Sequence, residues 1–366
     1  MAEKIHSQSE RLFSLDVFRG LIIIGMILVN TVESSAIPQL NHVVWHGWTF
    51  ADTIFPAFIW ITGVAMVFSL TKRLELGRNK ETITLQILRR SIILFLLGVF
   101  LYNFPFYHFS SIRILGILQR IALCYLIGGT IFLWTTIRKQ IVFICLLLIG
   151  YWILLKFVSI PGFGAGIEQN GNIVQYVDLI LLKGHLWSPM WDPEGIVSTL
   201  GAITTLFFGI LVGQLLLSKR LATEKALQLL TSGILLSILG LVMDKWLPIN
   251  KNLWTSSYAV FMAGLSTTIF SILYFLIDIK NFKKWAKPFG IYGMNSIIIY
   301  AFSILLDKFL VLIKFGGISM PDYLSTRLFT GLVDPANAQL LFAILYILFL
   351  YGIAYLMYKK NWIIKI

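Results

Sequence analysis

The chain has 366 residues, of which 58% are hydrophobic and 13% are charged, and its net charge is +13. Soluble globular proteins carry about 25% charged residues, so this composition excludes a large water-facing surface, and its apolar content excludes disorder. The two cysteines, Cys124 and Cys145, both lie in apolar runs, which excludes a disulfide framework or a Cys-rich metal site. With a mean hydropathy of +0.83, the remaining class is a polytopic membrane protein.

Ten apolar segments are long enough, or nearly so, to cross a bilayer, because a spanning helix needs about 20 apolar residues. They do not alternate as the strands of a β-barrel do. The stretch before the first one is too polar and too long for a cleavable signal peptide, so that segment is expected to be a retained helix. The sequence thus predicts an all-α bundle of about ten transmembrane helices, forming a single domain over residues 1–366. The predicted spans are 15–33, 51–71, 87–104, 114–136, 140–159, 196–217, 226–244, 254–278, 289–307 and 339–358.

The distribution of basic residues predicts the orientation of this bundle. With the N-terminus in the cytoplasm, every cytoplasmic connection is basic, and the first external loop, 34–50, has no Lys or Arg. Both termini are therefore expected to be cytoplasmic. Because topology accounts for most of the basic excess, we expect no nucleic-acid partner.

Polar groups at the first predicted span are the first candidates for function, since ionisable groups are costly in lipid. Asp16 and Arg19 are three residues apart and share one helical face at the cytoplasmic entry. They form either an anchoring ion pair or a site in which Arg19 holds an anionic ligand. Asn30, at the external end, is either a helix-packing residue or part of a site with the loop that follows.

That loop reads NHVVWHGWTFADTIFP over residues 41–56. A His close to a carboxylate can serve as a general base, and His42 is near enough in sequence to Asp52 for contact. The alternative is an interfacial aromatic belt, formed by Trp45 and Trp48, with incidental histidines such as His46. Zinc fits poorly without an HxxxH pair or a nearby Cys, so we expect no metal.

Two further clusters adjoin later spans. Gln119 and Arg120 lie about two turns into the fourth span, where an Arg must have a partner or line a polar cavity. That partner is either a carboxylate, such as Asp16 or Asp52, or the phosphate or thioester of a ligand. In WDPEG, residues 191–195, Asp192 before a proline predicts a helix N-cap.

INKNLW, residues 249–254, contains Asn252 and Trp254, and GMNS, residues 293–296, places Asn295 inside the ninth span. Neither segment specifies a chemistry by itself. Together with the earlier clusters, however, they resemble the heparan-α-glucosaminide N-acetyltransferase family. The similar motifs occur in the family's order from Arg11 to about Tyr300: RLFSLDVFRG, MILVN, HVVWHGWTFADTIFP, GILQRIALCY, WDPEGIVSTLGAI, NKNLWTSSYA and GMNSIIIYA.

The resemblance implies transfer of an acetyl group from cytosolic acetyl-CoA, as co-substrate, to the amine of a terminal glucosamine across the membrane. It also implies a homodimer and, for a bacterial member, a multi-pass protein of the inner membrane. The family's active-site histidine matches His42, its motif asparagine Asn30 and its aspartate Asp52. His46 departs from the Asn that is common in relatives, and the N-terminal luminal portion of the animal enzyme is not matched.

For that reaction, His42 is expected to be the general base or a transient acetyl carrier, oriented by Asp52, with Asn30 as donor to the developing oxyanion. The candidates for binding acetyl-CoA are Arg19, Arg89, Arg90, Gln119 and Arg120. The candidates for contacting the amino-sugar acceptor are Trp45, Trp48, Asp192, Asn252, Trp254 and Asn295.

Two other function classes stay open. Arg120, Asn295 and Asn30 also suit the polar pathway of an amino-sugar transporter. A non-enzymatic membrane scaffold would tolerate substitution of His42 and Asp52.

Overall fold

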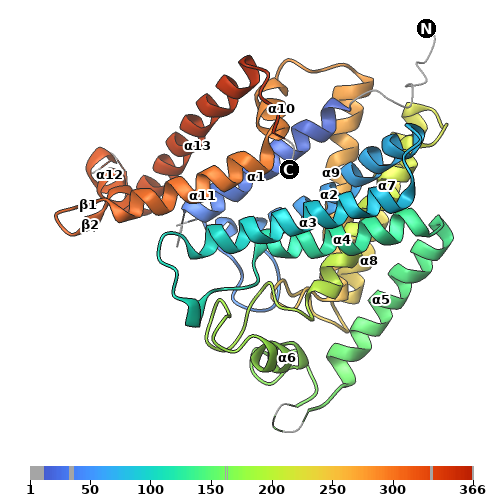
Figure 1. Ribbon diagram of the computed structural model, residues 1–366, viewed down its shortest axis with the longest axis horizontal. Helices are drawn as coiled ribbons and strands as arrows, with labels where there is room; N and C mark the ends of the chain where they lie inside the picture. Colours follow the sequence, from blue (N-terminus) through green and yellow to red (C-terminus); the bar gives the residue numbers. More distant parts are fainter. Residues whose placement is uncertain (1–11, 33–36, 161, 163, 330–332, 365–366) are drawn as a thin grey trace.

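The computed structural model describes residues 12–32, 37–160, 162, 164–329 and 333–364. Arg11 and residue 33, at the edges of the first motif and the first predicted span, lie outside these residues. In this part of the chain, nine helices are long and apolar enough to cross a membrane, and a bent pair of helices is a tenth candidate (Figure 1). The predicted all-α membrane bundle of about ten spans is confirmed.

The nine long helices follow the predicted segments closely. They are α1 (Phe13–Thr31), α2 (Phe50–Glu75), α3 (Lys80–Asn103), α4 (Ile117–Trp134), α5 (Ile137–Phe157), α7 (Thr199–Leu217), α8 (Ala222–Met243), α9 (Ser256–Tyr274, continued by a π-helical turn to Ile279) and α13 (Pro335–Lys359). Side chains at two N-caps satisfy backbone groups that a helix end leaves unpaired. Asn79 accepts from Thr82 N before α3, and Thr255 accepts from Tyr258 N before α9.

Burial separates a central group of helices from a lipid-facing one. About two-thirds of the span is buried in α1, α2, α7 and α9, but only 22–28% in α3, α5, α8 and α13. Since lipid tails are as apolar as leucine, helices in a bilayer associate by close backbone packing at small residues. On α7, Gly209 lies against the carbonyl of Trp60 on α2, and Gly63 on α2 lies against that of Leu206.

The ninth predicted span, 289–307, is broken, and the prediction of one continuous helix there is wrong. Its residues form α10 (Lys287–Met294) and α11 (Ser296–Leu312), which meet at Asn295 with a bend of 80°. The cause is tight packing of α10 on α1, where Gly293 lies against Asp16 O and Gly20 against Phe289 O. A straight continuation through Asn295 would lose the contacts of Asn295 with the end of the chain.

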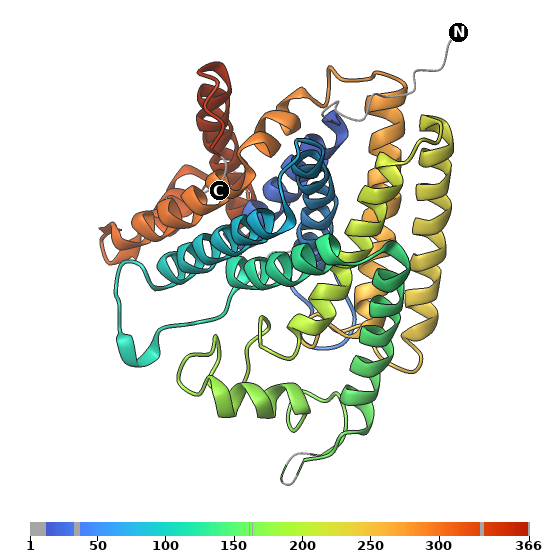
Figure 2. The same ribbon diagram turned by 45° about the vertical axis from the view of Figure 1, so that its right-hand side comes forward.

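The long connections between α5 and α7 and between α11 and α13 contain structure of their own. The first includes α6 (Ile173–Leu181), which lies beside the lower end of α5 in both views (Figures 1 and 2). The second includes an antiparallel pair of short strands, β1 (Lys314–Phe315) and β2 (Ile318–Ser319), followed by α12 (Met320–Phe329). The two remaining elements are the 3-10 turns η1 (Pro38–Leu40) and η2 (Phe109–Ser111).

Candidate active site

The loop between α1 and α2 brings His42 against Asp52, the third residue of α2. His42 Nδ1 lies 2.8 Å from Asp52 Oδ1. A third group joins them from the connection between α8 and α9, where Lys251 Nζ lies 3.2 Å from Asp52 Oδ1. The same Nζ lies 2.9 Å from Nδ1 and 3.3 Å from Nε2 of His42. Segments about 200 residues apart in the chain thus form one cluster of three ionisable groups.

The Asp52 carboxylate is held rigidly by the local sequence. Its Oδ2 accepts hydrogen bonds from Val43 N, Thr49 N and Thr49 Oγ1. Thr49 and Asp52 have the spacing of a capping box, in which the third helical residue bonds back to the N-cap. The Tyr258 hydroxyl donates to the Asp52 carbonyl at 2.6 Å. This network fixes Oδ1 in place for its contacts with His42 and Lys251.

The three side chains differ sharply in exposure. The Asp52 side chain is fully buried and that of Lys251 is 14% exposed, whereas that of His42 is 49% exposed. Burial lowers the pKa of Lys251, against the attraction of Asp52 and Glu194, which raise it. The imidazole is therefore the member of the cluster that faces outward. A half-exposed imidazole held on a buried carboxylate is the arrangement of a general base.

The segment that carries Lys251 is clamped onto the loop that carries His42. Gly47 N donates to Ile249 O at 2.8 Å, and Asn250 Nδ2 lies 3.3 Å from His46 Nδ1. Asn252 Nδ2 donates to Val44 O at 3.5 Å. This polar clamp positions Lys251, and it gives Asn252 and His46 contacts within the protein.

The two predicted stacking tryptophans lie in different surroundings. Trp45 Nε1 donates to Ile167 O, and its ring packs edge-on against Trp191 at 6.0 Å. Trp45 thus links the His42 loop to the connection that contains α6. Trp48 is 41% exposed and packs one side against Phe261, so part of its ring is open at the same end of the molecule as His42.

Arg120 is buried in the first turn of α4, where none of the described carboxylates pairs with it. Its Nη2 donates to Ser198 Oγ at 2.5 Å and Gly195 O at 3.2 Å, and its guanidinium lies 5.0 Å from the centre of the Trp254 ring. Its Nε and Nη1 have no hydrogen-bond partner within the described ranges. The predicted pairing with Asp16 or Asp52 is wrong: in the described part of the chain Arg120 forms no ion pair.

Trp254, which the sequence marks as a substrate contact, is fully buried. Its Nε1 donates to Thr205 Oγ1, and its ring packs edge-on against Phe55 and Tyr258. Its backbone φ of 50° is in the left-handed region. This residue therefore contacts Arg120 and the core, and a substrate could reach it only inside the bundle.

Asp192 does not cap the following helix, contrary to the prediction. The N-cap of α7 is Ser198, six residues later. Both Asp192 oxygens are bound by Arg113, at 3.1 Å from Nε and 2.8 Å from Nη2, and they also accept from Trp187 N and Glu194 N. Arg113 Nη2 contacts Glu194 as well, at 2.7 Å. The charge of Arg113 holds Asp192 within a turn. Both carboxylate oxygens of Asp192 thus accept hydrogen bonds from within the protein.

The predicted acetyl-CoA residues near the start of α1 and on α3 lie away from His42. Arg19 forms the expected ion pair with Asp16, at 3.2 Å, and donates to Gly293 O. Arg90 lies over the Tyr125 ring at 4.5 Å, and Arg89 is exposed.

The two other candidate asparagines, Asn30 and Asn295, have partners on the last third of the chain. The amide of Asn295 bonds Trp362 O and Ile364 N, and it adjoins the α10 turn that packs on the start of α1, whereas His42 follows the end of α1. Asn295 is thus not brought together with His42. Asn30 is exposed and hydrogen-bonds Tyr300 on α11.

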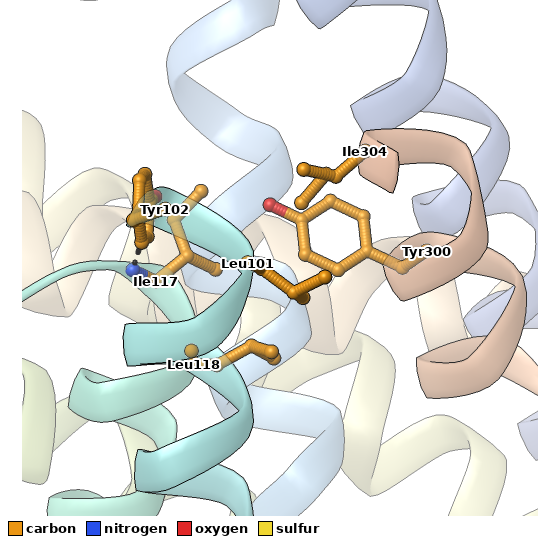
Figure 3. A pocket seen from close by; sticks show the side chains of 7 residues that line it. Leu101, Tyr102, Ile117, Leu118, Tyr300 and Ile304 are labelled. Atoms are coloured by element: carbon orange, nitrogen blue, oxygen red, sulfur yellow. Dashed lines mark hydrogen bonds between the residues drawn. The ribbon is translucent and has the colours of Figure 1, made fainter. Parts of the chain in front are cut away.

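A small apolar pocket lies between α3, α4 and α11 (Figure 3). It is lined by Gly98, Leu101, Tyr102, Ile117, Leu118, Tyr300 and Ile304. Its wall has polar neighbours: Tyr300 bonds Asn30, and Gly98 lies against the amide of Gln119. That amide is fully buried, and neither its oxygen nor its nitrogen has a hydrogen-bond partner in the part of the chain that the structure describes. The pocket therefore adjoins one unsatisfied amide and Asn30.

Comparison with known proteins agrees with this arrangement. Residues 11–240, more than half of the chain, match the model of the family described as heparan-alpha-glucosaminide N-acetyltransferase, catalytic. The protein of that name from Mus musculus is 28% identical over 366 residues, covering 84% of this chain and 55% of its own length. The Homo sapiens protein is 29% identical over 350 residues, with coverages of 79% and 52%. This chain spans about half the length of the curated relatives it matches. It belongs to the heparan-alpha-glucosaminide N-acetyltransferase catalytic family.

Proposed function

We propose that this chain is a transmembrane acetyltransferase. It takes the acetyl group of acetyl-CoA from the side of its basic loops and passes it to the amine of a glucosamine-type sugar at the His42 end. The observation that carries the proposal is the His42–Asp52 contact of 2.8 Å, found in a chain of this family. The relatives' names specify N-acetyl transfer to a glucosaminide, which supplies the acceptor class.

The imidazole performs the proton transfer that the reaction needs. With Nδ1–H donated to Asp52, the Nε2 lone pair is free to accept a proton. The amine nitrogen forms a bond to the thioester carbon, and its proton goes to His42 Nε2. The carbon–sulfur bond then breaks, and the CoA thiolate takes that proton and leaves as the thiol. General-base assistance of this kind contributes a rate factor of about 100 to 10,000.

The interior of the bundle supplies donors for the thioester end of acetyl-CoA. Among the described residues, two nitrogens of Arg120, Nε and Nη1, and the whole amide of Gln119 have no hydrogen-bond partner, and both side chains are fully buried. Unpaired polar groups are costly in a protein interior, and more so within a bilayer, so such groups mark a place for a polar ligand. We assign the carbonyls of the acetyl-pantetheine arm to these donors, and the developing oxyanion to Asn30.

Charge and exposure indicate which residues bind the CoA phosphates and which contact the acceptor sugar. Arg19, Arg89 and Arg90 are the candidates for the CoA phosphates, because arginine matches phosphate geometry and these residues lie apart from the His42 loop. At the opposite end, the open part of the Trp48 ring offers an apolar face to a sugar. The proposed setting is the inner membrane of a bacterium, with the protein as a homodimer.

The experiment is an acetyl-transfer assay with purified protein in liposomes, using labelled acetyl-CoA and glucosamine. The parent should form N-acetylglucosamine, and His42→Ala should lower the rate at least about 100-fold with unchanged elution in size-exclusion chromatography. His108→Ala is the matched control, since His108 is exposed directly before the η2 turn. Glucosamine uptake without acetyl-CoA, and without acetylated product, would instead identify a transporter.

A further inference from the structure

Lys251 lies against the His42 ring in a way that a simple hydrogen bond does not explain. Its Nζ is 2.9 Å from Nδ1 and 3.3 Å from Nε2. The lone pairs of the two ring nitrogens diverge in the ring plane, so one ammonium cannot be in line with both. The shorter contact of Nδ1 is with Asp52 Oδ1, at 2.8 Å, against 3.2 Å for Nζ to that oxygen. Nδ1–H therefore donates to Asp52, and the ammonium rests beside the ring.

The charges around the ring come from several elements. Asp52 on α2 is the carboxylate that contacts His42, and it contacts Lys251 as well. Glu194, before α7, attracts the Lys251 ammonium from further away, and Arg120 on α4 repels it. A proton on His42 would place a second cation beside Lys251, with one Asp52 oxygen shared between them. Asp52 favours that proton, and Lys251 opposes it.

We propose that Lys251 is a positioning residue for His42: its ammonium keeps the imidazole in the unprotonated form that can accept a proton from the acceptor amine. The effect of Lys251 on catalysis rests on the proposed function, whereas its contact with His42 does not. The role requires a positive charge at this position and not merely a side chain that fills the space. Arginine should therefore substitute for Lys251, and neutral residues should not.

The test measures how readily His42 reacts with diethylpyrocarbonate, which modifies unprotonated imidazole, between pH 5 and pH 9. Peptide mass spectrometry reports the extent at His42, so this readout does not depend on acetyl transfer. In Lys251→Met, and in Lys251→Gln, which keeps a donor for Asp52, the pH of half-maximal reaction should rise by at least about half a unit. A shift of this size corresponds to the repulsion between two like unit charges about 4 Å apart in water. The dielectric constant of water is appropriate because the His42 ring is half-exposed.

Lys251→Arg should keep the midpoint of the parent. Lys245→Met is the matched control, because Lys245 is exposed in the same connection and should leave the midpoint unchanged. The acid limb of kcat/KM for glucosamine acetylation should move with the midpoint. Neutral variants that react like the parent at every pH, or at lower pH, would overturn the proposal. A parent without acetyltransferase activity would refute the proposed function, while the His42 midpoints would still decide the role of Lys251.

Discussion

The close contact between α2 and α7 predicts that two glycine-to-alanine changes, one inside the contact and one outside it, alter the free energy of unfolding in opposite directions. On α7, a Cβ at Gly209 would meet the backbone carbonyl of Trp60, closer than Cβ atoms in real proteins approach an oxygen. Backbone cannot rotate away as a side chain can, so Gly209→Ala must push the helices apart. At Gly150, in the middle of α5, an added Cβ meets nothing within 4 Å.

The magnitudes follow from these two environments. Overpacking of a well-packed interior costs about 1–3 kcal/mol, so Gly209→Ala should lower the free energy of unfolding by at least that much. Gly150→Ala should instead raise it by up to about 1 kcal/mol, because alanine is the better helix former and no contact is disturbed. The unfolding free energies of the two variants should therefore differ by about 1–4 kcal/mol although the chemical change is the same.

The measurement is unfolding of the purified variants in mixed micelles, followed by far-UV circular dichroism as a denaturing detergent is titrated. Because α2 carries Asp52 at its start, Gly209→Ala should also reduce acetyl-transfer activity, and Gly150→Ala should not. Equal unfolding free energies for the two variants would refute close backbone packing of α2 on α7 as a source of stability.

Two further predictions concern single carboxylates. Asp52→Asn should lower kcat at least about 100-fold in the liposome assay, because Lys251 loses its counter-charge and the His42 ring loses its anionic partner. A kcat within a few-fold of that of the parent would contradict the role of Asp52. Burial, and then the charge of Asp192, raise the pKa of Asp178 to about 6. Between about pH 4 and pH 6 the folded state therefore binds more protons at this carboxyl than the unfolded state does. Ionisation of Asp178 thus lowers the free energy of unfolding as the pH rises through this range. The unfolding free energy of Asp178→Asn, relative to that of the parent, should therefore rise by up to about 3 kcal/mol when the pH is raised from 4 to 7. A difference between the two proteins that does not change with pH would contradict this.

The spans of the bundle were predictable because bilayer thickness sets their length, and runs of about 20 apolar residues have few other uses. The break at Asn295 was not predictable in the same way. It depends on Gly20 and Gly293, which let α10 pack on α1, and on the bonds of Asn295 with Trp362 and Ile364, 67 and 69 residues away. Hydropathy registers how apolar a segment is, but not which distant segment its backbone contacts.

The candidate site shows the same limit. His42 and Asp52 are ten residues apart, and the capping-box spacing of Thr49 and Asp52 fixes the turn between them, so their contact could be expected from sequence. Lys251 is 209 residues from His42, and in sequence it is only one basic residue of the connection between two predicted spans. A Lys beside Asn250 and Asn252 was the available signal, and it indicates a polar segment without naming its partner.

Several buried charges among the described residues have an opposite charge beside them, and buried Arg120 has none, which bears on function. Asp52 is matched by Lys251, and Asp192 with Glu194 is matched by Arg113, in each case from a distant part of the chain. Arg120, equally buried, has only a hydroxyl, a carbonyl and the face of Trp254 among the described residues. Aromatic and dipolar contacts offset part of the cost of burying a cation, but a carboxylate would offset more. An arginine left in this condition retains two donors for a ligand carbonyl, which is what the proposed path of the acetyl thioester requires.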